Sequence, residues 1–341
     1  MWPRRDLSSI GCDFPASIPR LRWPRANFFQ RQATSLRHAR RMYDSLGDGA
    51  AFEALFRDLS PEMVIIENML AQFALTAQSF GKPVIMTSGF LSIGKDPATP
   101  PLDSNLFPAD SALGRFRVEM AWARHLGRQR IEEAVLGVLG PSQNRALRQV
   151  ARRYDISLKG RIDRSRYLFP TLRLPEIVHC PREFDFPRPS SPRLIHCGPG
   201  VNRPRIDAVC DWSWLDPRKP LVYCAMGSMM SALPGAHDLL RKVTAVFAGR
   251  SHFQLLLAIG RENHAWPDPQ PPGHTQIVPW APQLEVLSRA SVFLTHGGLN
   301  SVKESISFGV PMVVLPFSMT GSATPRAWCF TDWACRRTIA S

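Results

Sequence analysis

A glycine-rich turn stands between an apolar run and a segment with helical spacing. Residues 292–295 lead directly into His296-Gly297-Gly298, and a helix is expected to begin at about Asn300-Ser301. The first turn of a helix presents unpaired N–H groups and a partial positive charge, which attract phosphate groups. Glycines before that turn let an anion approach the backbone closely. The spacing therefore predicts a phosphate-binding turn, in which Asn300 or Ser301 can cap the helix.

Two nearby residues have side chains suited to the rest of a nucleotide. Glu304 lies one turn into the expected helix, where a carboxylate can accept hydrogen bonds from ribose hydroxyls. Trp280 lies in a loop after a short strand, where an indole can stack on a base. Structural alternatives stay open for each feature, because Gly-Gly often only breaks a strand, Asn-Ser often only caps a helix, and a single Trp often only packs in a core.

The second half of the chain alternates regularly between apolar runs and helical segments. This alternation is typical of a doubly wound, Rossmann-like domain, in which ligands bind at the carboxyl ends of the strands. Strands are expected over residues 221–225, 253–259, 275–278, 292–295 and 312–315, and helices over 238–247, 284–287 and 300–308.

The first half predicts an α/β arrangement with longer helices and a long loop. Helices are expected over residues 26–46, 51–59, 72–80, 111–138 and 142–153, and strands over 63–66 and 84–88. A strand, a helix and a second strand joined by short breaks indicate a parallel sheet. Residues 95–108 are expected to be a surface loop, and the Pro-rich residues 165–205 a linker. We therefore place a domain boundary near residue 205.

Composition narrows the functional classes. The net charge is +14, which can indicate nucleic-acid or membrane-surface binding. The arginines are scattered without interleaved aromatic residues, so we expect no nucleic-acid partner. No run approaches the ~18 apolar residues that a membrane helix requires, and no apolar run follows the basic residues of 1–25. We expect neither a membrane span nor a secretory signal, and a cytoplasmic location.

The seven cysteines suit a reducing compartment. Their number is odd and no pair has C-x-x-C spacing, so neither a disulfide framework nor a zinc site is expected.

The motifs together resemble the donor signature of the UDP-glycosyltransferases, in particular their bacterial macrolide-glycosyltransferase-like branch. Trp280-Ala281-Pro282-Gln283 is similar to the start of that signature. His296-x-Gly298-x-Asn300-Ser301-x-x-Glu304 is similar to its centre, and Gly309-Val310-Pro311 to its end. Met226-Gly227-Ser228 resembles the phosphate-facing loop after the first strand of the family's second domain. The resemblance covers about residues 50–317.

The resemblance implies the GT-B fold, with two facing Rossmann-like, doubly wound domains. Both domains are expected to be incomplete in this chain. Residues 1–205 would form a partial acceptor-side domain with its linker, residues 206–318 the donor-binding domain, and residues 319–341 an atypical tail. The implied reaction transfers a hexose from a nucleotide sugar, usually a UDP-sugar, to a hydroxyl of a small lipophilic acceptor. The family uses no metal, and no cofactor is expected besides the donor substrate.

The resemblance also assigns roles to matching positions. Ser228 would contact the diphosphate with the turn at His296, Trp280 would stack on the base, Gln283 would lie beside the nucleoside, and Glu304 would hold the ribose. The expected donor-binding residues are Ser228, Trp280, Gln283, His296, Gly297, Gly298, Asn300, Ser301 and Glu304.

Two departures from the family pattern affect the expected activity. The family begins with a strand and a turn that carries the catalytic His, whereas residues 1–25 contain no His, so no catalytic base is assigned. After Pro316 the composition changes, and a shifted reading frame would resemble the family's continuation. We expect a chain truncated at its N-terminus and frame-shifted at its C-terminus. The alternative to a transferase is thus an inactive remnant that at most binds nucleotide weakly.

Overall fold

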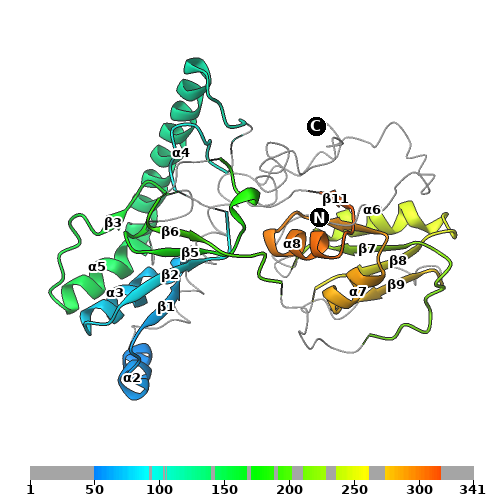
Figure 1. Ribbon diagram of the computed structural model, residues 1–341, viewed down its shortest axis with the longest axis horizontal. Coiled ribbons are helices and arrows are strands. Elements are labelled where there is room, and N and C mark those ends of the chain that lie inside the picture. Colours follow the sequence, from blue (N-terminus) through cyan, green and yellow to red (C-terminus); the bar gives the residue numbers. More distant parts are fainter. Residues whose placement is uncertain are drawn as a thin grey trace. The chain divides into compact units, whose positions relative to one another are not determined.

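The computed structural model describes most of the chain between residues 50 and 315. The expected helix over 26–46, the residues 1–25 and the tail from residue 319 lie outside the described part. The described residues form two compact units, which divide after Gly200 (Figure 1). The described ranges are 50–91, 94–102, 104, 106–139, 143–166, 170–187, 191–201, 210–227, 236–260 and 273–315.

The first unit contains a parallel sheet of four strands in the order β1-β2-β5-β6. These strands are β1 (Val64–Glu67), β2 (Val84–Ser88), β5 (Glu176–Val178) and β6 (Leu194–His196). A separate antiparallel pair consists of β3 (Ile162–Asp163) and β4 (Thr171–Leu172). The helices are α2 (Ala50–Leu59), α3 (Ala71–Ser79), α4 (Ala112–Leu139) and α5 (Gln143–Arg153), with short 3-10 helices η2 (Asn68–Leu70) and η3 (Arg182–Phe184).

The core of the first unit lies between β1, β2 and three helices. Phe56 of α2, Leu75 of α3 and Leu147 of α5 are buried together with Met86 of β2. Helix α3 is nearly all buried because it connects β1 to β2 and also packs against α5. Burial of these apolar side chains holds the two strands and the three helices together.

The expected linker over residues 165–205 is wrong, because β5 and β6 within it complete the first sheet. Each of these strands has only three residues and lies in a segment bounded by prolines, so it is too short for a periodic signal. A buried polar contact fixes β5. Glu176 accepts a hydrogen bond from Asn68 Nδ2 at 2.9 Å and another from Arg166 Nη1 at 2.8 Å, and all three residues are buried.

The second unit contains five parallel strands in the order β11-β10-β7-β8-β9. The chain starts in the middle of the sheet at β7, adds two strands on one side, and then returns to add two on the other (Figure 1). This order is that of a Rossmann-like domain. The elements are β7 (Leu221–Ala225), α6 (Ala236–Ala248), β8 (Gln254–Ala258), β9 (Thr275–Val278), α7 (Gln283–Arg289), β10 (Val292–Thr295), α8 (Leu299–Ser307) and β11 (Met312–Val314).

Both faces of the second sheet are covered. Val222 and Cys224 of β7 pack with Leu240 of α6 in one core cluster. The alternate residue Tyr223 packs with Leu287 of α7 in another. Strands buried on both faces are continuous apolar runs, as β7 is, and such runs are typical of parallel sheets between helices. The predicted α/β class is therefore confirmed.

Candidate functional site

The loops after β7 and β10 meet at the point where the strand order of the second sheet reverses. Ala225 at the end of β7 lies beside Thr295 at the end of β10. The connection from β7 leads to β8 on one side of the pair, whereas the connection from β10 leads to β11 on the other side. In open α/β sheets such a reversal leaves a crevice outside the carboxyl ends, where ligands bind.

The imidazole of His296 fills the space between these two loops. A Cβ added to Gly227 would lie 2.6 Å from His296 Cε1, and a Cβ added to Gly298 would lie 2.5 Å from His296 Nε2. At both distances an added side chain would force the ring or the loop to shift. Gly227 also has a φ of +88°, in the left-handed region that favours glycine. The two glycines therefore allow the ring to lie directly against the backbone of both loops.

His296 is kept neutral by its surroundings. Burial lowers the pKa of the imidazole below its ordinary value. Its Nδ1 is buried and has no hydrogen-bond partner among the described residues. A buried polar atom of this kind normally has a partner, so a ligand or a water molecule is expected to complete it. Among the described residues, nothing satisfies this nitrogen of the turn.

Helix α8 begins at this turn without a side-chain cap. Its N-cap is Gly298, with φ −62° and ψ 137°, and no side chain caps it. The prediction that Asn300 or Ser301 caps the helix is therefore wrong, because both already lie inside it. Val302 N–H bonds back to Gly298 O at 3.1 Å, so the N–H groups of residues 299–301 precede the first such bond. These donors and the helix dipole favour an anion.

A hydrogen-bonded cluster links α7 to the first turns of α8. Gln283 Nε2 donates to Glu304 Oε2 at 2.5 Å and to Ser301 Oγ at 3.3 Å. Tyr223 of β7 donates its hydroxyl to Gln283 Oε1 at 3.4 Å. The Tyr223 ring stacks on Phe293 of β10 at 4.8 Å between centroids. The amide of Gln283 is thus held from both sides and orients the Glu304 carboxylate.

The structure brings together most of the predicted donor-binding residues. His296, Gly297 and Gly298 form the turn, and Asn300 and Ser301 lie in the first turn of α8. Gln283 and Glu304 belong to the hydrogen-bonded cluster. Trp280 lies between β9 and α7, and 39% of its surface is exposed. Ser228 lies outside the described residues.

Sequence reasoning missed Tyr223, whose hydroxyl supports Gln283. No local signal marks Tyr223, because the residue that it pairs with, Phe293, is distant in the sequence and becomes its neighbour only in the sheet. It also missed Glu67, at the carboxyl end of β1 in the first sheet. Burial raises the pKa of the Glu67 carboxyl, although the carboxylate accepts a hydrogen bond from Met69 N at 2.6 Å. A carboxyl directly after a buried-strand pattern was the available signal.

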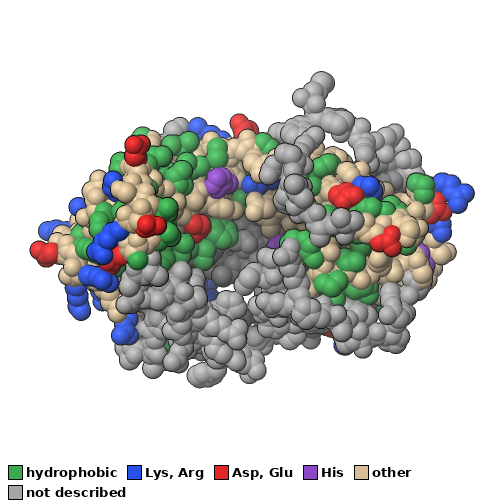
Figure 2. Space-filling view, turned by 90° about the horizontal axis from the view of Figure 1, so that it is seen from below, with side chains coloured by type: hydrophobic (Ala, Val, Ile, Leu, Met, Phe, Trp, Pro, Cys, Tyr) green, Lys and Arg blue, Asp and Glu red, His purple; other side chains and the backbone are tan. Residues whose placement is uncertain are grey.

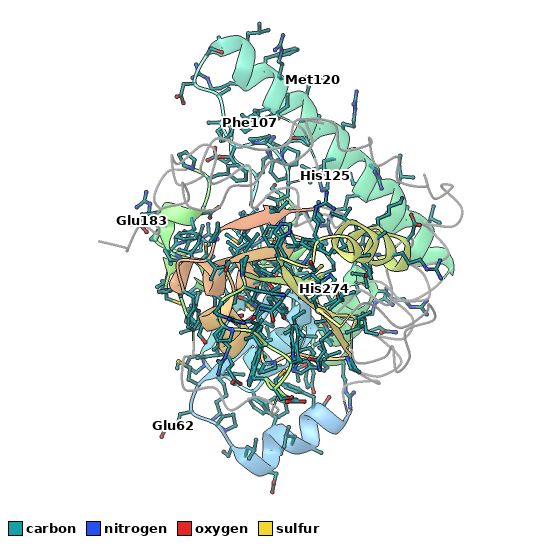
Figure 3. All side chains as sticks on the ribbon, turned by 90° about the vertical axis from the view of Figure 1, so that its right-hand side faces the viewer. Glu62, Phe107, Met120, His125, Glu183 and His274 are labelled. Carbon is teal, nitrogen blue, oxygen red and sulfur yellow. The ribbon has the colours of Figure 1, made fainter. Side chains whose placement is uncertain are left out.

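Two histidines labelled in Figure 3 contact an aromatic ring or a backbone carbonyl. His125 on α4 lies edge-on to the ring of Trp122 at 5.9 Å. His274 precedes β9, at the amino end of that strand, and its Nε2 lies 3.0 Å from Phe247 O. Neither lies at the carboxyl end of a strand, so no base is assigned to either. Among the described residues, no three His, Cys, Asp or Glu side chains form a candidate metal site.

One protein-family model matches a part of the chain. Residues 174–321 match the model of the family described as UDP-glucoronosyl and UDP-glucosyl transferase. This part of the chain is similar to the UDP-glycosyltransferase family. The matched range contains all of the second unit's strands and the turn at His296.

Curated relatives are longer than the part that aligns with this chain. Zeaxanthin glucosyltransferase from Pantoea ananas is 24% identical over 77% of this chain and 57% of its own length. An uncharacterised UDP-glucosyltransferase from Bacillus subtilis (strain 168) is 36% identical over 28% of this chain and 23% of its own. The chain thus spans little more than half of the first relative's length and about a quarter of the second's.

Solved structures show the same fold. The glycotransferase of kitacinnamycin is similar with a TM-score of 0.59 at 21% identity, covering 94% of this chain and 72% of that one. Spinosyn rhamnosyltransferase complexed with thymidine diphosphate is similar with a TM-score of 0.52 at 16% identity, covering 88% and 65%. The fold is the GT-B fold predicted from the sequence. None of the described helices is both long and apolar enough to cross a membrane.

Proposed function

We propose that the second unit binds the nucleoside diphosphate part of a sugar donor at the His296 turn. The observation that carries this proposal is the imidazole held between Gly227 and Gly298 at the uncapped start of α8. A diphosphate would accept hydrogen bonds from the backbone N–H groups of the helix and from the side chains of Asn300 and Ser301. The orphaned Nδ1 of His296 would find its partner in the same ligand.

The nucleoside is assigned to the other side of the same site. The Glu304 carboxylate, oriented by Gln283, would accept hydrogen bonds from the ribose hydroxyls. The exposed indole of Trp280 would stack on the base. The family match and the names of the glucosyltransferase relatives favour uridine and a glucosyl group. Ser228 is proposed as a further diphosphate contact.

The reaction proposed for the whole protein is transfer of a hexose to a hydroxyl of a small lipophilic acceptor. Negative charge develops on the leaving diphosphate as the bond to the sugar breaks. Fixed N–H donors and a helix dipole aimed at that charge stabilise it without reorganisation. A neutral His296 can donate one ring N–H to the same oxygen atoms. The acceptor hydroxyl must also lose a proton, and no residue is assigned to that step.

Thermal melting of the purified full chain with and without millimolar UDP tests the donor site. A ligand that binds only the native state raises the melting temperature by mass action. We expect an upward shift with UDP, and none with uridine, because the proposed site depends on the diphosphate. A melt that is indifferent to UDP would remove the basis of the proposal.

Turnover is tested separately. UDP-glucose is incubated with the chain, and released UDP is measured with and without flavonoid or carotenoid alcohols. UDP release that depends on acceptor supports transfer. Binding of UDP without release or transfer supports the alternative, in which the chain retains a nucleotide site and no transferase activity.

A further inference from the structure

Three side chains meet at the carboxyl ends of neighbouring strands in the first unit. Thr87 belongs to the end of β2, His179 directly follows β5, and Cys197 directly follows β6. The parallel register pairs Val178 with His196, so the next residues, His179 and Cys197, lie side by side. These residues are far apart in sequence, and the sheet alone brings them together.

The three groups contact one another in a fixed order. His179 Nε2 lies 2.5 Å from Thr87 Oγ1, and His179 Nδ1 lies 3.7 Å from Cys197 Sγ. In the tautomer with the proton on Nε2, the Nε2–H donates to the threonine hydroxyl and Nδ1 accepts from the thiol. A nucleophile, a base within reach of it and a third group that orients the base is the arrangement that activates a side chain for covalent chemistry.

Cys197 differs from the other cysteines of the described part of the chain. Cys180 and Cys224 are buried, whereas Cys197 is exposed. Cys210 is partly exposed, and burial, followed by the negative charges of Glu285 and Asp211, raises the pKa of its thiol. Among these four, Cys197 alone is exposed, and an imidazole nitrogen lies in hydrogen-bonding distance of its sulfur.

We propose that Cys197 is a nucleophilic thiol that exchanges with low-molecular-weight disulfides, with His179 as its base and Thr87 as a positioning residue. The Cys197 proton moves to His179 Nδ1, and the thiolate attacks one sulfur of the disulfide R–S–S–R. The bond between the two R-bound sulfurs breaks as the new Sγ–S bond forms. The leaving R–S⁻ takes the proton from His179 and departs as R–SH, so the histidine returns to its starting state.

In the described part of the first unit the other cysteine is Cys180, and we take the disulfide partner of Cys197 to be a separate molecule. Cys180 is the cysteine nearest in register, but it is buried and its Sγ donates to Pro181 O at 3.4 Å. The Cys197 sulfur instead faces His179 and solvent. An external disulfide can therefore reach Cys197, and Cys180 is not placed to displace it.

Residue-resolved labelling of the native full chain tests the proposal. The chain is treated with glutathione disulfide, or with isotope-coded N-ethylmaleimide, and the rate at each cysteine is read by peptide mass spectrometry. We expect Cys197 to react about tenfold faster than Cys210 under both reagents. His179→Gln should slow Cys197 by about tenfold, and Thr87→Val by a smaller factor that Thr87→Ser restores. A structural role for Thr87 alone would not produce this rescue.

The buried cysteines report on folding in the same experiment. Protection of Cys180 and Cys224 in a variant shows that the two sheets remain intact. If His179→Gln exposes them, the test uses two other comparisons. These are the rates of Cys197 and Cys210 in the parent chain, and the rates of Cys197 in Thr87→Val and Thr87→Ser. The proposal fails if Cys197 reacts no faster than Cys210, or if folded His179→Gln leaves its rate unchanged.

Discussion

At the scale of single residues, the site depends on His296 and on the groups that surround it. The ring lies against Gly227 and Gly298, so a larger residue at either position would force the ring or the loop to shift. Its Nδ1 is buried without a partner among the described residues. A neutral ring costs less to bury than an imidazolium, which accounts for the lowered pKa.

The lowered pKa of His296 predicts a pH dependence of stability. The unfolded chain binds a proton at His296 below about pH 6.5, whereas the folded chain takes it up only at lower pH. The stabilising contribution is therefore fully present above about pH 6.5 and is lost as the pH falls below that value. Melting temperatures at pH 7.5 and 5.5 should show a smaller loss for His296→Asn than for the parent. Equal losses in both proteins would contradict a buried neutral imidazole.

Glu304 predicts discrimination by the ribose. Glu304→Gln keeps the size of the side chain but removes the charge that ribose hydroxyls would meet. UDP should bind about tenfold more weakly to this variant, while 2′,3′-dideoxy-UDP should bind both proteins alike, because a hydrogen bond to a charged group contributes about 1.5–3 kcal/mol. Titration calorimetry of the two ligands measures this. An equal loss for both ligands would mean that Glu304 does not contact the ribose hydroxyls.

At the scale of elements, the longer apolar runs could be predicted from the sequence and the short ones could not. Strands expected at 221–225, 275–278 and 292–295 coincide with β7, β9 and β10. The three-residue strands β5 and β6 were read as linker, because their partners are distant and their own pattern is too short. The cap of α8 was also missed, because the backbone of Gly298, rather than a side chain, begins the helix.

The same distinction applies to the site. The signature placed His296, Gly298 and Glu304 correctly on one turn and helix, since their spacing is local. The contact of Gly227 with the imidazole and the support from Tyr223 join distant parts of the chain, and only the strand order brings them together.

The buried pair at β5 predicts a large effect on the first sheet. Glu176→Gln removes the charge that Arg166 meets in the core, and leaves the guanidinium buried without a counter-charge. Removal of one partner of a buried ion pair costs about 3–5 kcal/mol. Hydrogen exchange of β5 amides should rise strongly in this variant and less in the double variant Arg166→Met, Glu176→Leu. Unchanged exchange in Glu176→Gln would show that the pair does not hold β5.

At the scale of the whole molecule, the chain carries an excess of positive charge, and its described residues form two units. The net charge is +14, and Figure 2 shows several Lys and Arg side chains gathered at the left end of the face, with a few Asp and Glu side chains among them. The two units have separate cores, the first around α3 and the second around β7. The proposed donor site is therefore built from the sheet of the second unit and its His296 turn.

The most direct test of this account is calorimetric titration of UDP into three proteins: the parent, Gly298→Ala and Gly249→Ala. A Cβ at Gly298 would collide with His296, whereas a Cβ at Gly249 would meet nothing within 4 Å. We predict UDP binding to the parent and to Gly249→Ala with similar affinity, and at least about tenfold weaker binding to Gly298→Ala. Equal UDP affinity in all three proteins, with Gly298→Ala still folded, would contradict a donor site at the His296 turn.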